Sequence, residues 1–149
     1  MATRPDFSEC LSCSCFAARR AARTITQHYE AHLKPSGLRV GQFTLLAVLA
    51  AAGAQPLTRL ADQLAMERTT LTRNLRSLLE GGLVTESTTA DGRVRLLAIT
   101  RRGTAAARAA LPRWREAQKA VARSLGTDAI RGLAMAAQAI AELGNGRSQ

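Results

Sequence analysis

The chain has 149 residues, enough for about one domain with a modest core, and only 3% of them are aromatic. Its hydrophobic residues, 46% of the total, are mostly alanine and leucine, which favours closely packed helices over a sheet sandwich. The formal net charge of +10 indicates nucleic acid as the first class of partner and an acidic membrane surface as the second.

Three features that the sequence lacks narrow the class of protein further. No apolar run reaches the ~18 residues that cross a bilayer, so we expect no membrane association. The first ten residues lack the apolar segment of a signal peptide, and three clustered cysteines do not make a secreted disulfide framework. We therefore expect a cytoplasmic protein with reduced thiols.

A first helix is predicted from about Asp6, with Glu9 three residues later as in a capping box, although Ser8 competes as the N-cap. Pro35 and Gly37 then end it. Along it, small or apolar residues recur at alternating spacings of four and three: Leu11, Cys15, Ala18, Ala22, Ile25 and Tyr29. An apolar stripe this narrow at one end of a chain needs something to pack on.

Residues 40–53 form a second predicted helix, apolar on most sides and therefore buried. Two short helices follow. Thr58 is expected to cap the first, which buries Leu60, Ala61 and Leu64, and the second runs from about Arg68 to Glu80 before Gly81 and Gly82. This second helix buries Leu71, Leu75 and Leu78.

The opposite face of the helix over residues 68–80 is free of large apolar groups. It carries short hydroxyls and guanidinium groups, namely Thr69, Thr70, Thr72, Arg73 and Arg76. Threonine reaches phosphates or a thymine methyl group, and arginine forks onto a guanine edge. This face therefore predicts contact with DNA.

Residues 83–100 change to an extended, partly alternating pattern around Asp91-Gly92, a strong signal for a β-hairpin. Arg93 and Arg95 place cations at and beside the turn, where they are suited to a DNA groove or backbone. Asp91 is positioned to orient Arg93 through a charge-assisted hydrogen bond.

Thr100 is expected to cap a long helix in which Pro112 introduces a kink. Gly126 and Thr127 interrupt it. A last helix then carries apolar residues at alternating threes and fours, at Ile130, Leu133, Ala137 and Ile140.

No nucleophile–base or metal–base arrangement points to an enzyme. His28 and His32 are four residues apart on one helix, but neither an HExxH motif nor a nearby pair of carboxylates accompanies them, so we interpret them as surface or interface histidines.

The order of short helix, turn, polar-faced helix and hairpin with a basic tip is that of a winged helix-turn-helix. The sequence resembles the multiple antibiotic resistance regulator (MarR) family of bacterial transcription factors over about residues 10–143. The resemblance is most specific in "LADQLAMERTTLTRNLRSLLEGGLV", in the wing "DGR" and in "ITRRG". Glu67 departs from it, since the family more often has Asp, Ser or Asn at that helix cap.

The resemblance implies a mainly α-helical fold with one β-hairpin wing. Residues 37–100 would form the winged helix-turn-helix domain, and residues 1–36 and 101–149 a helical dimerisation layer. It also implies an obligate homodimer on a pseudo-palindromic double-stranded DNA operator. The implied DNA-binding residues are Arg68, Thr69, Thr70, Thr72, Arg73, Arg76, Asp91, Arg93 and Arg95.

Three interpretations of Cys10, Cys13 and Cys15 stay open at this point. They are small residues without a special role, a redox sensor, or thiolate ligands for a soft metal or metalloid ion. The metal site requires that the helix begin after Cys13, or that two subunits pool their thiols. We expect no other cofactor.

For the redox sensor, Arg19 lies one turn after Cys15 and would favour its thiolate. The stretch "CFAARRAARTITQHY" is also similar to the first helix of the organic hydroperoxide resistance regulators of the same family. In those relatives the cysteine that corresponds to Cys15 reacts with peroxide, and a tyrosine that corresponds to Tyr29 polarises it, so the resemblance favours Cys15 as the reactive thiol. Two further tyrosines of that branch are replaced here by Arg19 and Val40.

The sequence therefore predicts a homodimeric, sequence-specific transcriptional regulator that is not an enzyme. We expect a repressor, released by an oxidant, a metal ion or a small molecule that acts on the N-terminal cysteines or at the junction between the dimer layer and the DNA-binding lobe. The alternative is a non-specific nucleic-acid-binding or architectural protein.

Overall fold

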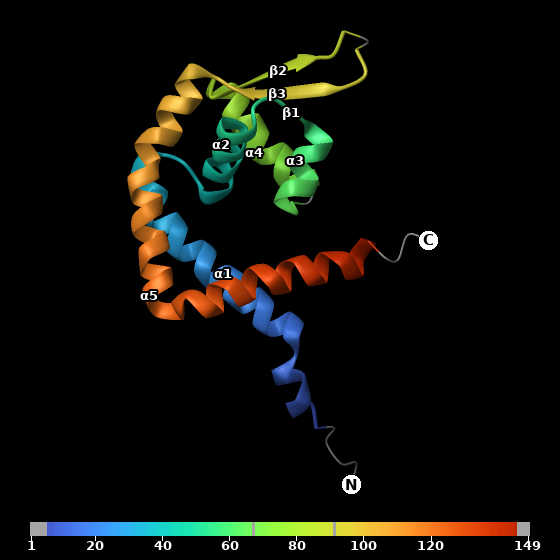
Figure 1. Cartoon of the computed structure of the whole chain (residues 1–149), viewed down its shortest axis with the longest axis vertical. Helices are drawn as coiled ribbons and strands as arrows, with labels where there is room; N and C mark the ends of the chain where they lie inside the picture. The colour runs from blue at the N-terminus through green and yellow to red at the C-terminus, as the bar shows by residue number, and fades with distance from the viewer. Residues whose placement is uncertain (1–5, 67, 91, 146–149) are drawn as a thin grey trace.

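A computed structural model describes residues 6–66, 68–90 and 92–145, and Figure 1 shows a small lobe of helices and a sheet attached to the long helices near the two ends of the chain. The helices are α1 (Ser14–Leu33), α2 (Val40–Ala52), α3 (Leu57–Leu64), α4 (Arg68–Glu80) and α5 (Arg101–Asn145), with 3-10 turns at Ser8–Ser12 and Lys34–Ser36. The strands are β1 (Gln55–Pro56), β2 (Val84–Thr88) and β3 (Arg95–Ile99). Glu67 and Asp91, and the side chains of Glu9 and Arg68, lie outside the described part of the chain.

The N-terminal segment does not form the single helix predicted from Asp6. A 3-10 turn over Ser8–Ser12 is followed by an extended residue, Cys13 (φ −61°, ψ 126°), and α1 begins only at Ser14. Serine and cysteine are poor residues for a helix interior, and Cys13 takes the N-cap position of α1. The prediction was therefore wrong about where the long helix starts.

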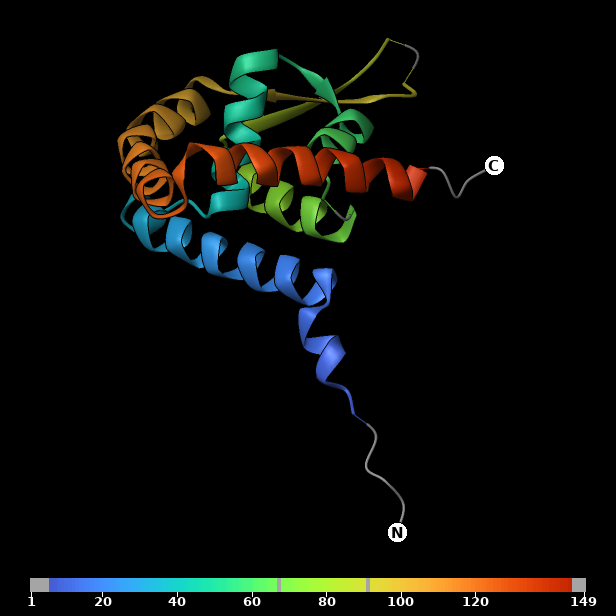
Figure 2. The ribbon, with the colours of Figure 1, turned by 60° about the horizontal axis from the view of Figure 1, so that its bottom comes forward.

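Helix α5 is interrupted where the sequence predicted it, at Gly126, whose left-handed φ of 77° breaks the helical backbone. The kink predicted at Pro112 is not accompanied by such a break, because the backbone keeps helical angles there. After Gly126 the chain turns back toward α1, as Figure 2 shows, and α1 packs against α5. No single helix in the described ranges is long and apolar enough to cross a membrane.

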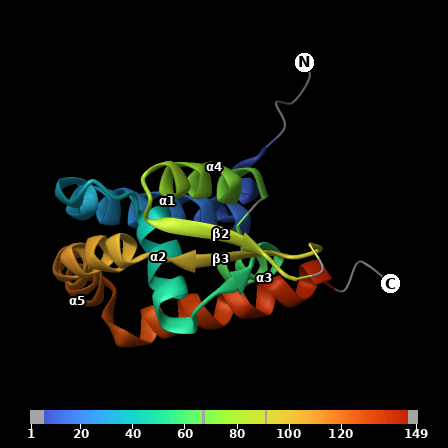
Figure 3. The ribbon, with the colours of Figure 1, turned by 90° about the horizontal axis from the view of Figure 1, so that it is seen from above.

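The predicted hairpin is present, with Val84 opposite Ile99 and Thr88 opposite Arg95. Its loop closes between Thr89 and Val94, where the Thr89 N–H donates to the Val94 carbonyl over 3.0 Å. Sequence reasoning missed the two-residue strand β1, which pairs with β3 and completes a sheet in the order β1-β3-β2. Seen from above in Figure 3, the loop of the hairpin and the part of α5 before Gly126 lie at opposite sides of α2.

The core of the lobe is built mainly from leucine. Leu60 of α3 and Leu71, Leu75 and Leu78 of α4 are buried, as the spacing predicted. Thr58 is not a cap, because α3 begins one residue earlier at Leu57 with Pro56 at its N-cap. The burial of the leucines fixes which face of α4 points outward.

Candidate nucleic-acid interface

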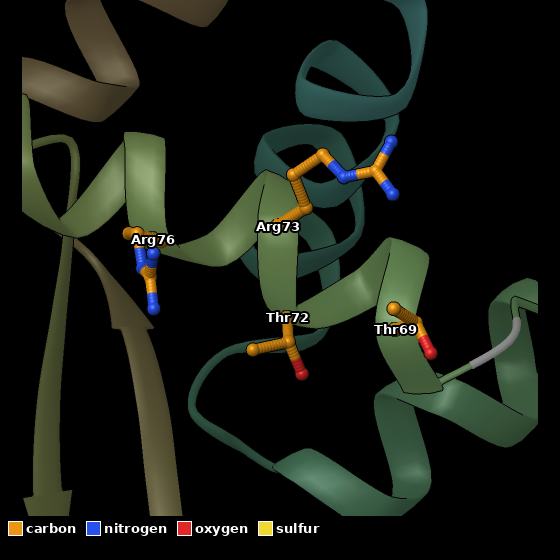
Figure 4. A pocket seen from close by; sticks show the side chains of 4 residues that line it. All are labelled: Thr69, Thr72, Arg73 and Arg76. Carbon is orange, nitrogen blue, oxygen red and sulfur yellow. The ribbon is translucent and has the colours of Figure 1, made fainter.

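The outward face of α4 carries the hydroxyls and guanidinium groups that the sequence singled out. Thr69, Thr72, Arg73 and Arg76 line a shallow cavity of about 440 Å³, and Figure 4 shows them projecting from successive turns of the helix. Thr70 is also exposed. Because Leu71, Leu75 and Leu78 hold the opposite face in the core, these polar side chains are presented on a rigid element.

A second cavity, of about 410 Å³, joins the wing to the helices. It is lined by Pro56, Leu57, Thr58, Thr72, Arg93, Val94 and Arg95. Thr72 lines both cavities, so the face of α4 and the basic residues of the wing form one continuous surface. The expected contact of Asp91 with Arg93 lies outside the described residues.

Arg95, predicted to bind DNA, is held within the wing. Its guanidinium forms a two-pronged ion pair with Glu86 of β2, in which Nε donates to Oε1 and Nη2 donates to Oε2 over 2.7 Å. Hydrogen bonding to Arg95 lowers the pKa of the Glu86 carboxyl, and the same contact raises the pKa of Arg95. Arg95 therefore braces the two strands as well as lining the cavity, a role that sequence reasoning missed.

Sequence reasoning also missed the contacts between α2 and α4. The Gln42 side chain accepts a hydrogen bond from the Arg39 N–H over 2.9 Å, and its Nε2 donates to Ser77 Oγ of α4 over 3.1 Å. Gly41 lies so close to α4 that an added Cβ would be 2.8 Å from Asn74 Nδ2. These contacts set the position of α4 relative to the helix before it.

The three cysteines are exposed at the start of α1. Cys13 has the distinctive thiol, because the backbone N–H groups of Phe16 and Cys15 in the first turn of α1 lower its pKa. Sequence reasoning had favoured Cys15. Although α1 begins after Cys13, as a metal site required, no three Cys, His, Asp or Glu side chains converge on a metal position among the described residues.

Tyr29 does not meet Cys15 within one chain. The two residues are fourteen positions apart on one helix, which corresponds to about 21 Å. Instead, Tyr29 donates a hydrogen bond to Gln118 of α5, and burial raises the pKa of its phenol. Any contact of the kind implied by the hydroperoxide regulators would have to come from a second subunit.

His28 and His32 lie where α1 packs against α5. His28 Nε2 is 3.3 Å from the Ala117 carbonyl oxygen, and His32 Nδ1 is 2.9 Å from the His28 carbonyl oxygen. Their rings are 4.4 Å apart between centroids. The contact with Ala117 gives His28 a structural role in the junction of the two long helices, whereas the contacts of His32 lie within α1.

The lobe has the architecture of a winged helix-turn-helix regulator. Helices α2 and α3 precede the polar-faced helix α4, the basic hairpin β2–β3 follows it, and the lobe is joined to the long helices α1 and α5. A helix-turn-helix domain family matches residues 43–87. The transcriptional regulator MosR of M. tuberculosis, solved in complex with DNA, is 40% identical over 86% of this chain and 98% of its own, with a TM-score of 0.73. The chain belongs to the MarR family of transcriptional regulators.

Two more distant structures share the fold. MarR of E. coli, in a mutant form bound to operator DNA, is 17% identical over 91% of this chain and 99% of its own, with a TM-score of 0.77. The repressor CouR, bound to a DNA duplex, is 22% identical over 93% and 99%, also with a TM-score of 0.77. No curated protein sequence matches the chain.

Proposed function

We propose that the protein is a homodimeric repressor that binds a pseudo-palindromic operator and is released by oxidation of its N-terminal thiols. The observation that carries the proposal is the continuous surface in which Thr72 connects the outward face of α4 with the basic wing. MosR, 40% identical, was solved in complex with DNA, which supports DNA as the ligand of this surface.

On this proposal α4 enters the major groove. Arg73 and Arg76 bind guanine edges or phosphates, and Thr69 and Thr72 contact phosphates or thymine methyl groups. Arg93, in the loop between β2 and β3, reaches the minor groove or the flanking backbone. Arg68, whose side chain is not described, would add a cation at the start of α4.

Exposed apolar side chains on the terminal helices support the homodimer. Leu11 and Phe16 near the start of α1 are 73% and 53% exposed, and Met135 and Ile140 near the end of α5 are 65% and 59% exposed. A largely apolar cavity of about 680 Å³ also lies between α1 and the part of α5 after Gly126. Such surfaces in a small protein mark an interface, and a second copy supplies the packing that the stripe on α1 lacks.

The redox switch is assigned to Cys13 as the attacking thiol. Its thiolate would displace an alcohol from an organic hydroperoxide and become a sulfenic acid, which a second cysteine converts to a disulfide with loss of water. Cys10 is the nearest candidate in the chain, because the Cys13 N–H donates to the Cys10 carbonyl over 3.3 Å. A disulfide there would alter the start of α1, and hence the dimer layer to which α4 is connected.

Sequence-specific binding predicts a defined operator. Selection from a random pool of duplexes should return a palindrome with half-sites about 10 base pairs apart, centre to centre. Its affinity in a shift assay should exceed that of random DNA by about 10³-fold or more at physiological salt. Equal affinity for selected and random duplexes would instead support a non-specific architectural protein.

Cys13→Ser is expected to abolish release by hydroperoxide, whereas Cys15→Ser should respond like the wild type. The measurement is affinity for the selected operator before and after addition of cumene hydroperoxide, for wild type and both variants. In the folded protein the pH midpoint of Cys13 alkylation should also lie below its value in denaturant, because the thiolate is favoured at the N-cap. Release that survives in Cys13→Ser and is lost in Cys15→Ser would reverse the assignment.

A further inference from the structure

The positive charge of this protein is concentrated outside its DNA-reading lobe. Residues 37–100 contain 7 basic and 5 acidic residues, a net charge of +2. The remaining residues contain 14 basic and 6 acidic residues, a net charge of +8. Most of the charge that suits a polyanion therefore lies on the long helices.

The first part of α5 arranges much of this charge in a line. Between residues 101 and 125 it has seven basic residues and a single acidic one, Glu116. Five of the basic residues are exposed and fall within about 80° of the helix circumference at 100° per residue. These five, called here the α5 stripe, are Arg101, Arg108, Arg115, Lys119 and Arg123.

The α5 stripe points away from the rest of the molecule. Ala110 and Ala117, which are fully buried, lie about 180–200° from Arg108 on the helix, so the stripe is on the side opposite the core. In Figures 1 and 3 this part of α5 and the hairpin loop lie at opposite sides of α2. A duplex held by α4 and the wing therefore leaves the stripe exposed.

The charge pattern is unfavourable for a helix that serves only as a solvated support. Arg101 and Arg102 occupy the first turn of α5, which holds no acidic residue, although the helix dipole disfavours cations there. Arg115, Lys119 and Arg123 are like charges four residues apart, which destabilises a helix. The ion pairs found among the described residues, Arg95–Glu86 and Arg131–Asp128, include none of the side chains of the stripe.

The shape of the stripe suits a nucleic-acid backbone. It extends about 33 Å, the length of one turn of B-DNA, and four of its five cations are arginines, which bind phosphate in a two-pronged geometry. The positions between them on this face are small or polar, such as Ala105 and Pro112, without the large apolar residues that insert into a lipid surface.

We propose that the α5 stripe is a second, sequence-independent binding surface for the phosphate backbone of double-stranded DNA, which lets one protein hold a second duplex beside the one read by α4 and the wing. Both duplexes would be bound at once, so the protein would bridge DNA segments. This surface does not depend on the operator-reading proposal, because it uses none of the residues of α4 or the wing.

The test uses the full-length reduced protein and random-sequence duplexes of about 30 base pairs, nearly three turns of DNA. One duplex is fixed to beads and loaded with protein, and capture of a second, labelled duplex is measured over a series of salt concentrations. The variants are Arg108→Gln/Arg115→Gln on the stripe and the matched control Arg102→Gln/Arg113→Gln. The control removes the same charge from the same helix, about 120–140° away from Arg108.

We expect the wild type and the control to capture the second duplex, and the stripe variant to lose at least about tenfold in capture. The stripe variant should also lose roughly 2 units of salt slope per subunit engaged, since each neutralised phosphate contributes about 0.9. In an Arg73→Ala/Arg76→Ala background, residual binding to the random duplex should depend on the stripe in the same way.

Three results would overturn the proposal. They are failure of the wild type to capture a second duplex, equal losses in the stripe and control variants, and stripe-dependent binding to phosphatidylglycerol vesicles without duplex capture. Circular dichroism of each variant establishes that a loss does not come from unfolding, since arginine and glutamine have similar helix propensities.

Discussion

Gly103→Ala is expected to destabilise the winged-helix lobe strongly. A Cβ at this position would lie 2.0 Å from the Leu83 carbonyl oxygen and 2.9 Å from Ile99 Cγ1. The Leu83 carbonyl accepts a hydrogen bond from the Thr100 N–H over 3.0 Å, so moving it away from the new Cβ would break this hydrogen bond. Alanine therefore forces the start of α5 away from the base of the wing.

The size of the effect follows from the backbone contact. Overpacking that forces a backbone shift costs about 1–3 kcal/mol and more where backbone meets backbone, and a domain of this size has about 5–15 kcal/mol of stability in total. We expect a loss of about 3 kcal/mol or more, measured as the free energy of unfolding in urea.

Ala105→Gly is the matched control, at an exposed position of the same turn. It should lose only about 1 kcal/mol through helix propensity. If Gly103→Ala were no more destabilising than Ala105→Gly, the close approach between α5 and the wing would not be a constraint on the fold.

The elements with a long, regular pattern were predictable from the sequence. The bounds of α4 were predicted as found, because three leucines at helical spacing and two terminal glycines define it locally. The hairpin followed from Asp91-Gly92 between extended segments. In both cases the signal is contained within about twenty residues.

The features that were missed depend on distant partners or on competing local interactions. Strand β1 has only two residues, too few for any periodicity, and exists because Gln55 pairs with Leu97 some forty positions later. The helix predicted from Asp6 is interrupted at Cys13, because this residue is the N-cap of α1 and an N-cap has a non-helical backbone. A single sequence contains no pattern that tells whether Cys13 caps a helix or lies inside one.

The features of the candidate site also divide into those that a local pattern predicts and those that depend on distant partners. The polar face of α4 was predicted because its other face is plainly apolar, and the cavities confirm that it is open. The ion pair of Arg95 with Glu86 was missed, since a sequence gives the charges of a hairpin but not its register. The role implied for Tyr29 stays a prediction: within one chain its hydroxyl donates to Gln118 and does not meet Cys15, and a sequence motif does not say which subunit supplies the contact.

Arg73→Ala/Arg76→Ala is expected to lose operator binding while the protein keeps its fold. Both side chains are exposed and line the cavity on α4, so their removal leaves the leucine core intact. A two-pronged arginine contact to a base is worth about 1–3 kcal/mol, and a tenfold change in affinity corresponds to about 1.4 kcal/mol. Two such contacts per subunit predict a loss of at least about 100-fold in affinity for the selected operator.

Substitution by lysine separates the two kinds of contact that these arginines make. Arg73→Lys/Arg76→Lys keeps the charge but lacks the planar fork that reads a guanine edge. If α4 reads bases, the lysine variant should bind random DNA like the wild type and lose its preference for the operator. Full recovery of that preference by lysine would mean that the two positions contact only phosphates, and that the wing and the threonines of α4 carry the sequence specificity.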